Sequence, residues 1–421
     1  METMVKFTPE RQDELIGLCQ NLIRTRSYSG EENEVVDKIK AVCLELGYDE
    51  VKVDKYGSVI GHIKGKRPGP RLLFDGHLDT VPVPEPADWT HEPFGGEIHA
   101  GKIYGRGASD MKGAVAAMIC AAAYFGRDSG RDFAGDLYVV GSVHEECFEG
   151  VSSRSVSEQI KPDYVVIGEA SNCNVKRGQK GRAEIVVETF GKPAHSANPH
   201  KGINAAYKAA RLVEQIQQLP MAHHPVLGDG ILELTDIKSS PYPGASVVPD
   251  YCKMTYDRRL LVDETSSSVI KPILDLIVTM QQEDHEFKAN AYYAKGREQC
   301  YTGTVIGGER YFPAWLLDEQ DEYVQKVLQA LRETGLDPEI THYDFCTNGS
   351  HYAGEAGIKT IGFGPSLENL AHTIDEYIEI QQLISAARGY YAISNAILGQ
   401  AGAGKRAGGL GRDLSALFNS V

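Results

Sequence analysis

Several short apolar segments of this chain end abruptly in a polar turn that carries histidine or glutamate, and this pattern restricts its fold. Three segments share the feature: 72–74 is followed by His77, 137–143 by Glu145 and Glu146, and 165–168 by Glu169. Short apolar runs bounded by polar turns are typical of buried strands. In an open α/β sheet, ligands bind at the carboxyl ends of the strands. The pattern predicts an α/β fold with these side chains gathered at one edge of a sheet.

Composition excludes several classes of protein. The net charge of −15 argues against a nucleic-acid-binding surface. The eight cysteines form no Cys-x-x-Cys pair, so we expect reduced core thiols and a cytoplasmic protein. The first residues are charged and no apolar run is long enough to span a bilayer, so neither a signal peptide nor a membrane segment is expected.

The 421 residues are enough for two or three domains, and the pattern changes twice along the chain. From about residue 181, strands and helices follow in the order βαββαβ, which predicts a ferredoxin-like sheet inserted into the α/β domain. The expected division is 1–180 for the first part of the catalytic domain, 181–295 for the insertion, 296–398 for the second part, and 399–421 for a flexible, Gly-rich tail.

A glycine-rich segment, 105–113, places Asp110 in a tight turn before an alanine-rich helix at 114–125. In isolation, Asp110 could be a helix cap rather than a ligand. Similarly, the adjacent Glu145 and Glu146 could form a solvated turn.

Taken together, the candidate ligands comprise two imidazoles and three carboxylates. They are His77, Asp110, Glu146, Glu169 and His372. This mixture suits zinc, or cobalt or manganese, better than copper or calcium. Five side chains are too many for one open catalytic zinc but suit two ions that share a carboxylate, for which Asp110 is the natural bridge. Glu145 would then be free to act as the general base and acid.

These residues also carry a resemblance to a known family. The motifs are Gly76–Pro82, Gly105–Gly113, His144-Glu145-Glu146, Gly168-Glu169-Ala170 and Ala371-His372-Thr373. In this order they resemble the di-zinc amidohydrolase and peptidase family of acetylornithine deacetylase, succinyl-diaminopimelate desuccinylase, aminoacylase and glutamate carboxypeptidase. The resemblance implies a mixed-sheet catalytic domain with an inserted lid and dimerisation domain.

The same resemblance implies a role for each side chain. His77, Asp110 and Glu169 would hold one metal ion. Asp110, Glu146 and His372 would hold the other. Asp79 would orient His77, Glu145 would be the general base, and the peptide bond after Asp110 would be cis.

The resemblance extends to the inserted domain. Gly191–Pro199 and Gly202–Ala205 look like the family's lid and dimerisation motif, in which His195 would stabilise the oxyanion, often from the partner subunit. In isolation, His195 could be an ordinary surface histidine. Asp257-Arg258-Arg259 resembles a strand whose arginine binds the substrate carboxylate, and strand alternation selects Arg259. The alternative for Arg259 is a surface salt bridge.

Two loops depart from the family pattern. Ser246-Val247-Val248-Pro249 lacks the asparagine that the family often has there. The loop 347–350 differs from the usual Gly-Thr/Ser-Asp pattern, and Asn348 is predicted to contact substrate. Both loops resemble a little-characterised subgroup associated with purine and selenium-dependent catabolism.

The sequence thus predicts a homodimeric hydrolase with two divalent ions, zinc or else cobalt or manganese. It would cleave an amide bond in a small N-acyl amino acid or dipeptide that carries a free carboxylate, using a metal-bridging water activated by Glu145. One alternative is a ureido or carbamoyl amidohydrolase, which would release ammonia. Another is a metal-dependent binding protein without catalysis, which would bind a ligand and form no product.

Overall fold

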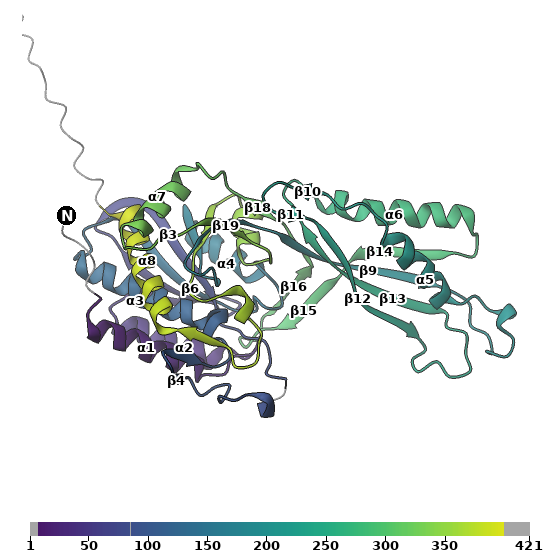
Figure 1. Ribbon diagram of the computed structural model, residues 1–421, viewed down its shortest axis with the longest axis horizontal. Coiled ribbons are helices and arrows are strands. Elements are labelled where there is room, and N and C mark those ends of the chain that lie inside the picture. The colour runs from purple at the N-terminus through teal and green to yellow at the C-terminus, as the bar shows by residue number, and fades with distance from the viewer. Residues whose placement is uncertain (1–6, 85, 400–421) are drawn as a thin grey trace, which may run out of the picture.

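The computed structural model describes residues 7–84 and 86–399. They form a larger body around a nine-stranded sheet and a smaller, elongated body around a five-stranded sheet (Figure 1). The predicted tail lies almost entirely outside the described residues. None of the described helices combines the length and the apolar character that crossing a bilayer requires.

The nine-stranded sheet is mixed. Its order is β1 (Glu50–Val53), β2 (Val59–Lys64), β6 (Ala134–Ser142), β3 (Arg67–His77), β7 (Tyr164–Ile167), β20 (Lys359–Gly362), β8 (Val175–Gln179) and β18 (Trp315–Leu316), with β19 (Ile340–Tyr343) also beside β8. β6, β3, β7 and β20 run parallel to their neighbours in this series. Their carboxyl ends therefore meet at one edge.

Helices cover both faces of this sheet. They are α1 (Pro9–Ile23), α2 (Asn33–Glu45), α3 (Gly113–Asp128), α7 (Glu322–Arg332) and α8 (Ile380–Leu398) on one face, and α4 (Val151–Ile160) with the turn η4 (Ser350–Glu355) on the other. Strand alternation divides β3 between the two cores, because Leu72 and Phe74 pack with the first group and Leu73 with the second. Buried alanines allow α3 to pack closely against its neighbours.

The smaller body has the predicted βαββαβ order. Its elements are β9 (Gly181–Phe190), α5 (Ala205–Ile216), β12 (Ile231–Ser240), β13 (Tyr251–Leu260), α6 (Ser266–Glu283) and β14 (Lys288–Tyr293). The sheet order β12-β13-β9-β14 is fully antiparallel, and buried side chains of α5 and α6 pack with it in one core. The predicted fold class is therefore confirmed. β17 (Tyr311–Phe312) lies beyond residue 295 but pairs with β9 of the smaller sheet. The domain boundary at residue 295 therefore stays a prediction.

Short elements complete the described chain. They are β4 (Glu97–His99), β5 (Lys102–Tyr104), β10 (His223–His224), β11 (Gly228–Asp229), β15 (Lys295–Gln299), β16 (Val305–Glu309) and β21 (Tyr377–Glu379), with the single turns η1 (Pro86–Asp88), η2 (Ala108–Lys112), η3 (Pro199–Lys201) and η5 (Glu368–Leu370). One pairing matters for the site. β21, which follows residue 372 in the chain, pairs antiparallel with β5, which precedes residue 110, so these two segments lie side by side.

Candidate metal centre

The ends of three parallel strands bring the predicted ligands to one place. His77 is the last residue of β3 and lies opposite Ser142, the last residue of β6. On the other side of β3, Asp75 lies opposite Ile167, the last residue of β7. The loops that carry Glu145, Glu146 and Glu169 therefore leave the sheet beside His77.

Asp110 lies between the two histidines and presents one oxygen to each. His77 Nε2 is 2.8 Å from Asp110 Oδ1, and His372 Nε2 is 3.2 Å from Asp110 Oδ2. Asp110 sits in η2, where its φ and ψ depart from helical values, and the peptide bond to Met111 is cis, as the resemblance implies. This is the arrangement that a carboxylate shared by two ions requires.

One glutamate lies beside each of the two histidines. Glu169 Oε1 lies 3.5 Å from His77 Nε2, and Glu146 Oε2 lies 3.1 Å from His372 Nε2. His77 is 1 % exposed, whereas half of the His372 side chain is exposed. One side of the centre is therefore buried and the other opens toward solvent.

Ligand atoms form two compact trios within this cluster. His77, Asp110 and Glu146 make one, and His77, Glu145 and Glu169 make the other, each with atoms within 4.8 Å of one another. The second trio differs from the predicted ligand set, because it contains Glu145. Glu145 is buried, and its Oε1 has no hydrogen-bond partner among the described residues. A carboxylate oxygen in this state is available to take up a proton.

The charge of the cluster favours cations. Burial raises the pKa of Glu145 and of Glu169 well above its ordinary range, and neighbouring carboxylates raise both further. Hydrogen bonds to Asp110 and Glu146 raise the pKa of His372 to about 10. Although burial acts in the opposite direction, hydrogen bonds from the two histidines lower the pKa of Asp110. The donor set of imidazole nitrogens and carboxylate oxygens fits zinc, cobalt or manganese.

Asp79 supports the centre in an unpredicted way. The His77 ring donates from Nδ1 to the main-chain oxygen of Asp79 at 2.8 Å, while the Asp79 carboxylate is 3.7 Å from that nitrogen. The carboxylate instead accepts the main-chain N–H groups of Glu145 and Glu146, at 3.0 and 3.1 Å, and the Ser29 hydroxyl. Asp79 therefore orients His77 chiefly through its backbone, and its side chain holds the turn that carries the two glutamates.

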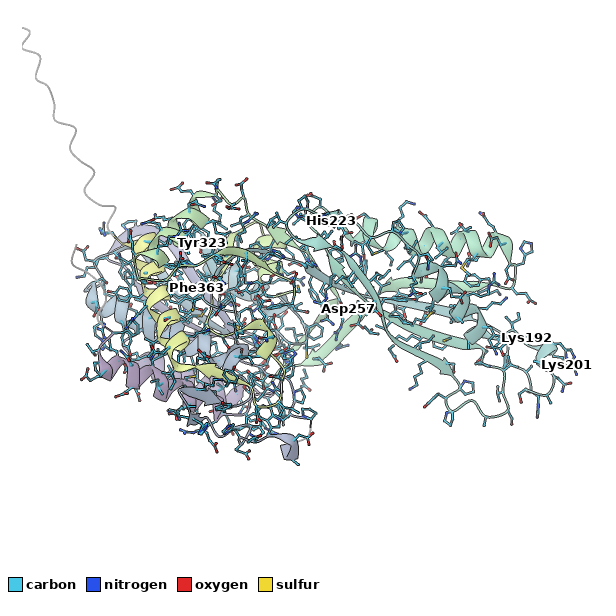
Figure 2. The ribbon with its side chains drawn as sticks, in the orientation of Figure 1. Lys192, Lys201, His223, Asp257, Tyr323 and Phe363 are labelled. Carbon is cyan, nitrogen blue, oxygen red and sulfur yellow. The ribbon has the colours of Figure 1, made fainter. Side chains whose placement is uncertain are left out.

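His195 is not brought to the cluster within one chain. In the chain it stands between Lys192 and Lys201, which lie at the end of the smaller body farthest from the larger one (Figure 2). The His195 Nδ1 accepts the main-chain N–H of Ala197 at 3.0 Å.

Arg259 is two residues after Asp257 on β13, and Asp257 lies near the junction of the two bodies (Figure 2). Its Nε is 2.8 Å from Asp257 Oδ1, and its side chain is 29 % exposed. Asp257 also pairs with Arg182, which in turn pairs with Glu149 of the loop after Glu146. A chain of alternating charges thus links Arg259 to the loop that carries the glutamates.

The Asn348 side chain is buried and makes hydrogen bonds within the protein. Its side-chain nitrogen donates to Asp75 Oδ1 at 2.8 Å and to Ser142 Oγ at 2.9 Å, and its oxygen accepts the main-chain N–H of Gly150. Both N–H donors are therefore used, and the side chain is buried. Asn348 thus ties together the ends of β3 and β6, and its contact with substrate stays a prediction.

Comparison with known proteins agrees with this architecture. The model of the peptidase family M20/M25/M40 matches residues 73–396. The uncharacterized protein YgeY of Escherichia coli is 33 % identical over 390 residues, which cover 91 % of this chain and 94 % of that protein. A succinyl-diaminopimelate desuccinylase of Cereibacter sphaeroides is 27 % identical, covering 87 % of this chain and 94 % of the enzyme. The crystal structure of aminopeptidase PepT from Bacillus cereus superimposes with a TM-score of 0.71 at 19 % identity, covering 92 % and 98 % of the two chains.

The fold and the cluster define a metallohydrolase of the peptidase or desuccinylase type. The chain belongs to the peptidase family M20/M25/M40, whose members typically bind two metal ions.

Proposed function

We propose that this protein hydrolyses an amide bond in a small N-acyl amino acid or dipeptide, with Glu145 as the general base. The observation that carries the proposal is the position of Glu145, which is buried beside His77 and Glu169 with one carboxylate oxygen unpaired. Next to a set of metal ligands, a carboxylate that is free to exchange a proton is suited to hydrolysis.

His77, Asp110 and Glu169 would hold one ion, and Asp110, Glu146 and His372 the other. Two divalent ions at such a centre polarise the substrate carbonyl and lower the pKa of water. Glu145 would take a proton from the attacking water on its unpaired Oε1 and deliver it to the nitrogen of the leaving amine. Asp79 would keep Glu145 in place through the main-chain N–H that it accepts.

Arg259 is the proposed contact for the substrate carboxylate. Its Asp257 partner is shared with Arg182, so Asp257 does not by itself neutralise Arg259. A guanidinium with spare hydrogen-bonding capacity can bind a carboxylate in a bidentate geometry. This favours N-acyl amino acids and dipeptides, which end in a free carboxylate, over amides that lack one.

The test is turnover of a panel of N-acyl amino acids and dipeptides, with zinc, cobalt or manganese added and products identified by mass spectrometry. We expect release of a free amino acid from at least one member, and a loss of about 10²–10⁴-fold in kcat for Glu145→Ala. Glu158→Gln, an exposed site on α4, is the matched control and should keep full activity. Full turnover by Glu145→Ala would remove the mechanism, and ammonia release from ureido compounds without peptide cleavage would replace the substrate class.

We also propose a homodimer formed through the smaller body. His195 lies too far along that body to serve its own centre, because its segment is at the end remote from the larger body (Figure 2). A second copy of the chain could bring His195 to the centre of the first, where an imidazole would stabilise the oxyanion.

A further inference from the structure

A buried ion pair lies directly behind Asp110. Arg106 Nη1 is 2.6 Å from Glu376 Oε2, and the two side chains are 2 % and 0 % exposed. A fully buried ion pair is costly unless other hydrogen bonds satisfy its remaining atoms. The second Glu376 oxygen therefore needs hydrogen-bond donors of its own.

Glu376 Oε1 accepts two main-chain N–H groups of the turn η2. They belong to Ser109, at 2.8 Å, and to Asp110 itself, at 3.0 Å. These donors precede α3 in a turn that is not a regular helix, so the chain supplies them with no helical acceptor. One oxygen of Glu376 thus binds the peptide groups on both sides of the Ser109 Cα atom.

The backbone of Glu376 is fixed to the same segment. Gly105 donates its main-chain N–H to the Glu376 oxygen at 2.8 Å, and Tyr377 pairs with Tyr104 where β21 meets β5. His372, four residues before Glu376, faces Asp110 Oδ2 at 3.2 Å. Two segments that are distant in sequence, each carrying one candidate ligand, are therefore joined through Glu376.

We propose that Glu376 is a positioning residue that sets the direction of the Asp110 carboxylate and its separation from His372, with Arg106 as its counter-charge. The inference rests on the proposed two-ion centre. Asp110 can serve two ions only if each of its oxygens faces a different ion, so a small rotation would withdraw an oxygen from one of them. Glu376 is not itself one of the candidate ligands, and its side chain bonds to Arg106 and to the main chain of Ser109 and Asp110, so its effect on the centre would pass through Asp110 and, along the chain, His372.

The experiment measures metal binding rather than turnover. Full-length protein is stripped with a chelator, and the affinity for two equivalents of Co²⁺ is measured by chelator competition while the visible absorption of bound Co²⁺ is recorded. The variants are Glu376→Asp and Glu376→Gln. The controls are Glu379→Gln, an exposed site on β21 just after Glu376, and Glu264→Gln, which breaks a partly buried ion pair with Arg258 in the smaller body.

Glu376→Asp is the decisive variant because it keeps the charge that balances Arg106 but moves the carboxylate back from the two N–H groups. We expect it to fold and to lose about 10–100-fold in affinity for at least one ion, with an altered Co²⁺ spectrum. Glu376→Gln should lose as much or more, and both controls should bind two ions as the wild type does.

Wild-type affinity and an unchanged spectrum in folded Glu376→Asp would overturn the inference and leave the proposed function intact. An equal loss in Glu264→Gln would also overturn it, because the effect would then reflect general destabilisation. A wild-type protein that binds no Co²⁺ would overturn the proposed function, and the inference with it.

Discussion

Asp79 shows how a single residue can support a site without touching the reaction. Its carboxylate accepts the N–H groups of two successive residues, Glu145 and Glu146, so one side chain fixes the turn in which one glutamate faces each part of the centre. Adjacent residues just beyond a strand can point in different directions, but only a fixed turn makes those directions reproducible.

Replacing Asp79 with Asn should therefore weaken both folding and catalysis. The amide can accept with its oxygen, but its NH₂ group would face an N–H donor and leave that donor unpaired. We expect a loss of about 1–3 kcal/mol in the free energy of unfolding, and about 10–100-fold in kcat by displacement of Glu145. Urea denaturation and steady-state kinetics measure the two effects. Ser29→Ala removes only one hydrogen bond to the same carboxylate and should cost about 1 kcal/mol; equal losses in the two variants would contradict this account.

Most of the candidate ligands are visible in the sequence, because His77, Glu146 and Glu169 follow apolar strands and Asp110 lies in a glycine-rich turn. His372 is named by the family resemblance. Asn348 and Glu376 illustrate what could not be predicted. The contacts of Asn348 with Asp75 and Ser142 depend on sequence separations of 273 and 206 residues, which no local pattern reveals. Glu376 follows His372 by four residues, but only the pairing of β21 with β5 brings it under Asp110.

At the scale of elements, α4 and η4 are joined by a network of polar side chains. Arg154 and Ser157 of α4 face Glu355 and His351 of η4: Arg154 pairs with Glu355 at 2.5 Å, and Glu355 accepts from His351 at 2.8 Å. Although burial alone would raise it, hydrogen bonds from His351 and Arg154 lower the pKa of Glu355 to about 2, from an ordinary value of 4.5.

This shift predicts a pH-dependent contribution to stability. Because the pKa is lower in the folded state, the ionised Glu355 stabilises the protein fully above pH 4.5, and this contribution is lost as the pH falls toward about 2. Glu355→Gln should therefore cost about 1–3 kcal/mol at neutral pH, and the difference from wild type should shrink at acid pH. Urea denaturation of the metal-free proteins at pH 7 and pH 3 checks this, with the exposed Glu339→Gln as control. A difference that does not change with pH would contradict the assignment.

The elements themselves were predicted unevenly, for a physical reason. The strands and helices of the smaller sheet have one buried face, so their periodicity is visible in the sequence. In β13, for example, buried residues alternate with more exposed ones along the strand. β8 has the sequence VKRGQ, which shows no such pattern, yet it is largely buried. Its Lys176 is accommodated because Glu368 and the His342 main-chain oxygen bind its Nζ, and these partners come from distant segments.

At the scale of the whole molecule, the smaller body extends away from the larger one, and the segment that carries His195 lies between Lys192 and Lys201 at its far end (Figure 2). The proposed dimer explains this separation, because each centre would be completed by its partner. Light scattering at the assay concentration should give the mass of a dimer, and a monomeric, active protein would contradict the proposal.

Mixing two inactive variants tests the shared site more directly. In a mixed dimer of Glu145→Ala and His195→Ala chains, one centre would contain both Glu145 and a His195 from the partner. Random reassociation of equal amounts would make about half of the dimers mixed, each with one complete centre out of two. The mixture should therefore recover about a quarter of wild-type activity. The two variants assayed separately are the controls, and no recovery from dimers shown to have exchanged subunits would place His195 outside the reaction.

The central claim is that side chains from three strand ends and two distant loops hold a pair of ions. The most direct measurement is anomalous diffraction at the zinc edge from crystals of the metal-loaded protein. The account predicts two peaks about 3.5–4 Å apart, one beside His77 and Glu169, the other beside Glu146 and His372, with Asp110 between them. A single peak, or peaks away from Asp110, would contradict it.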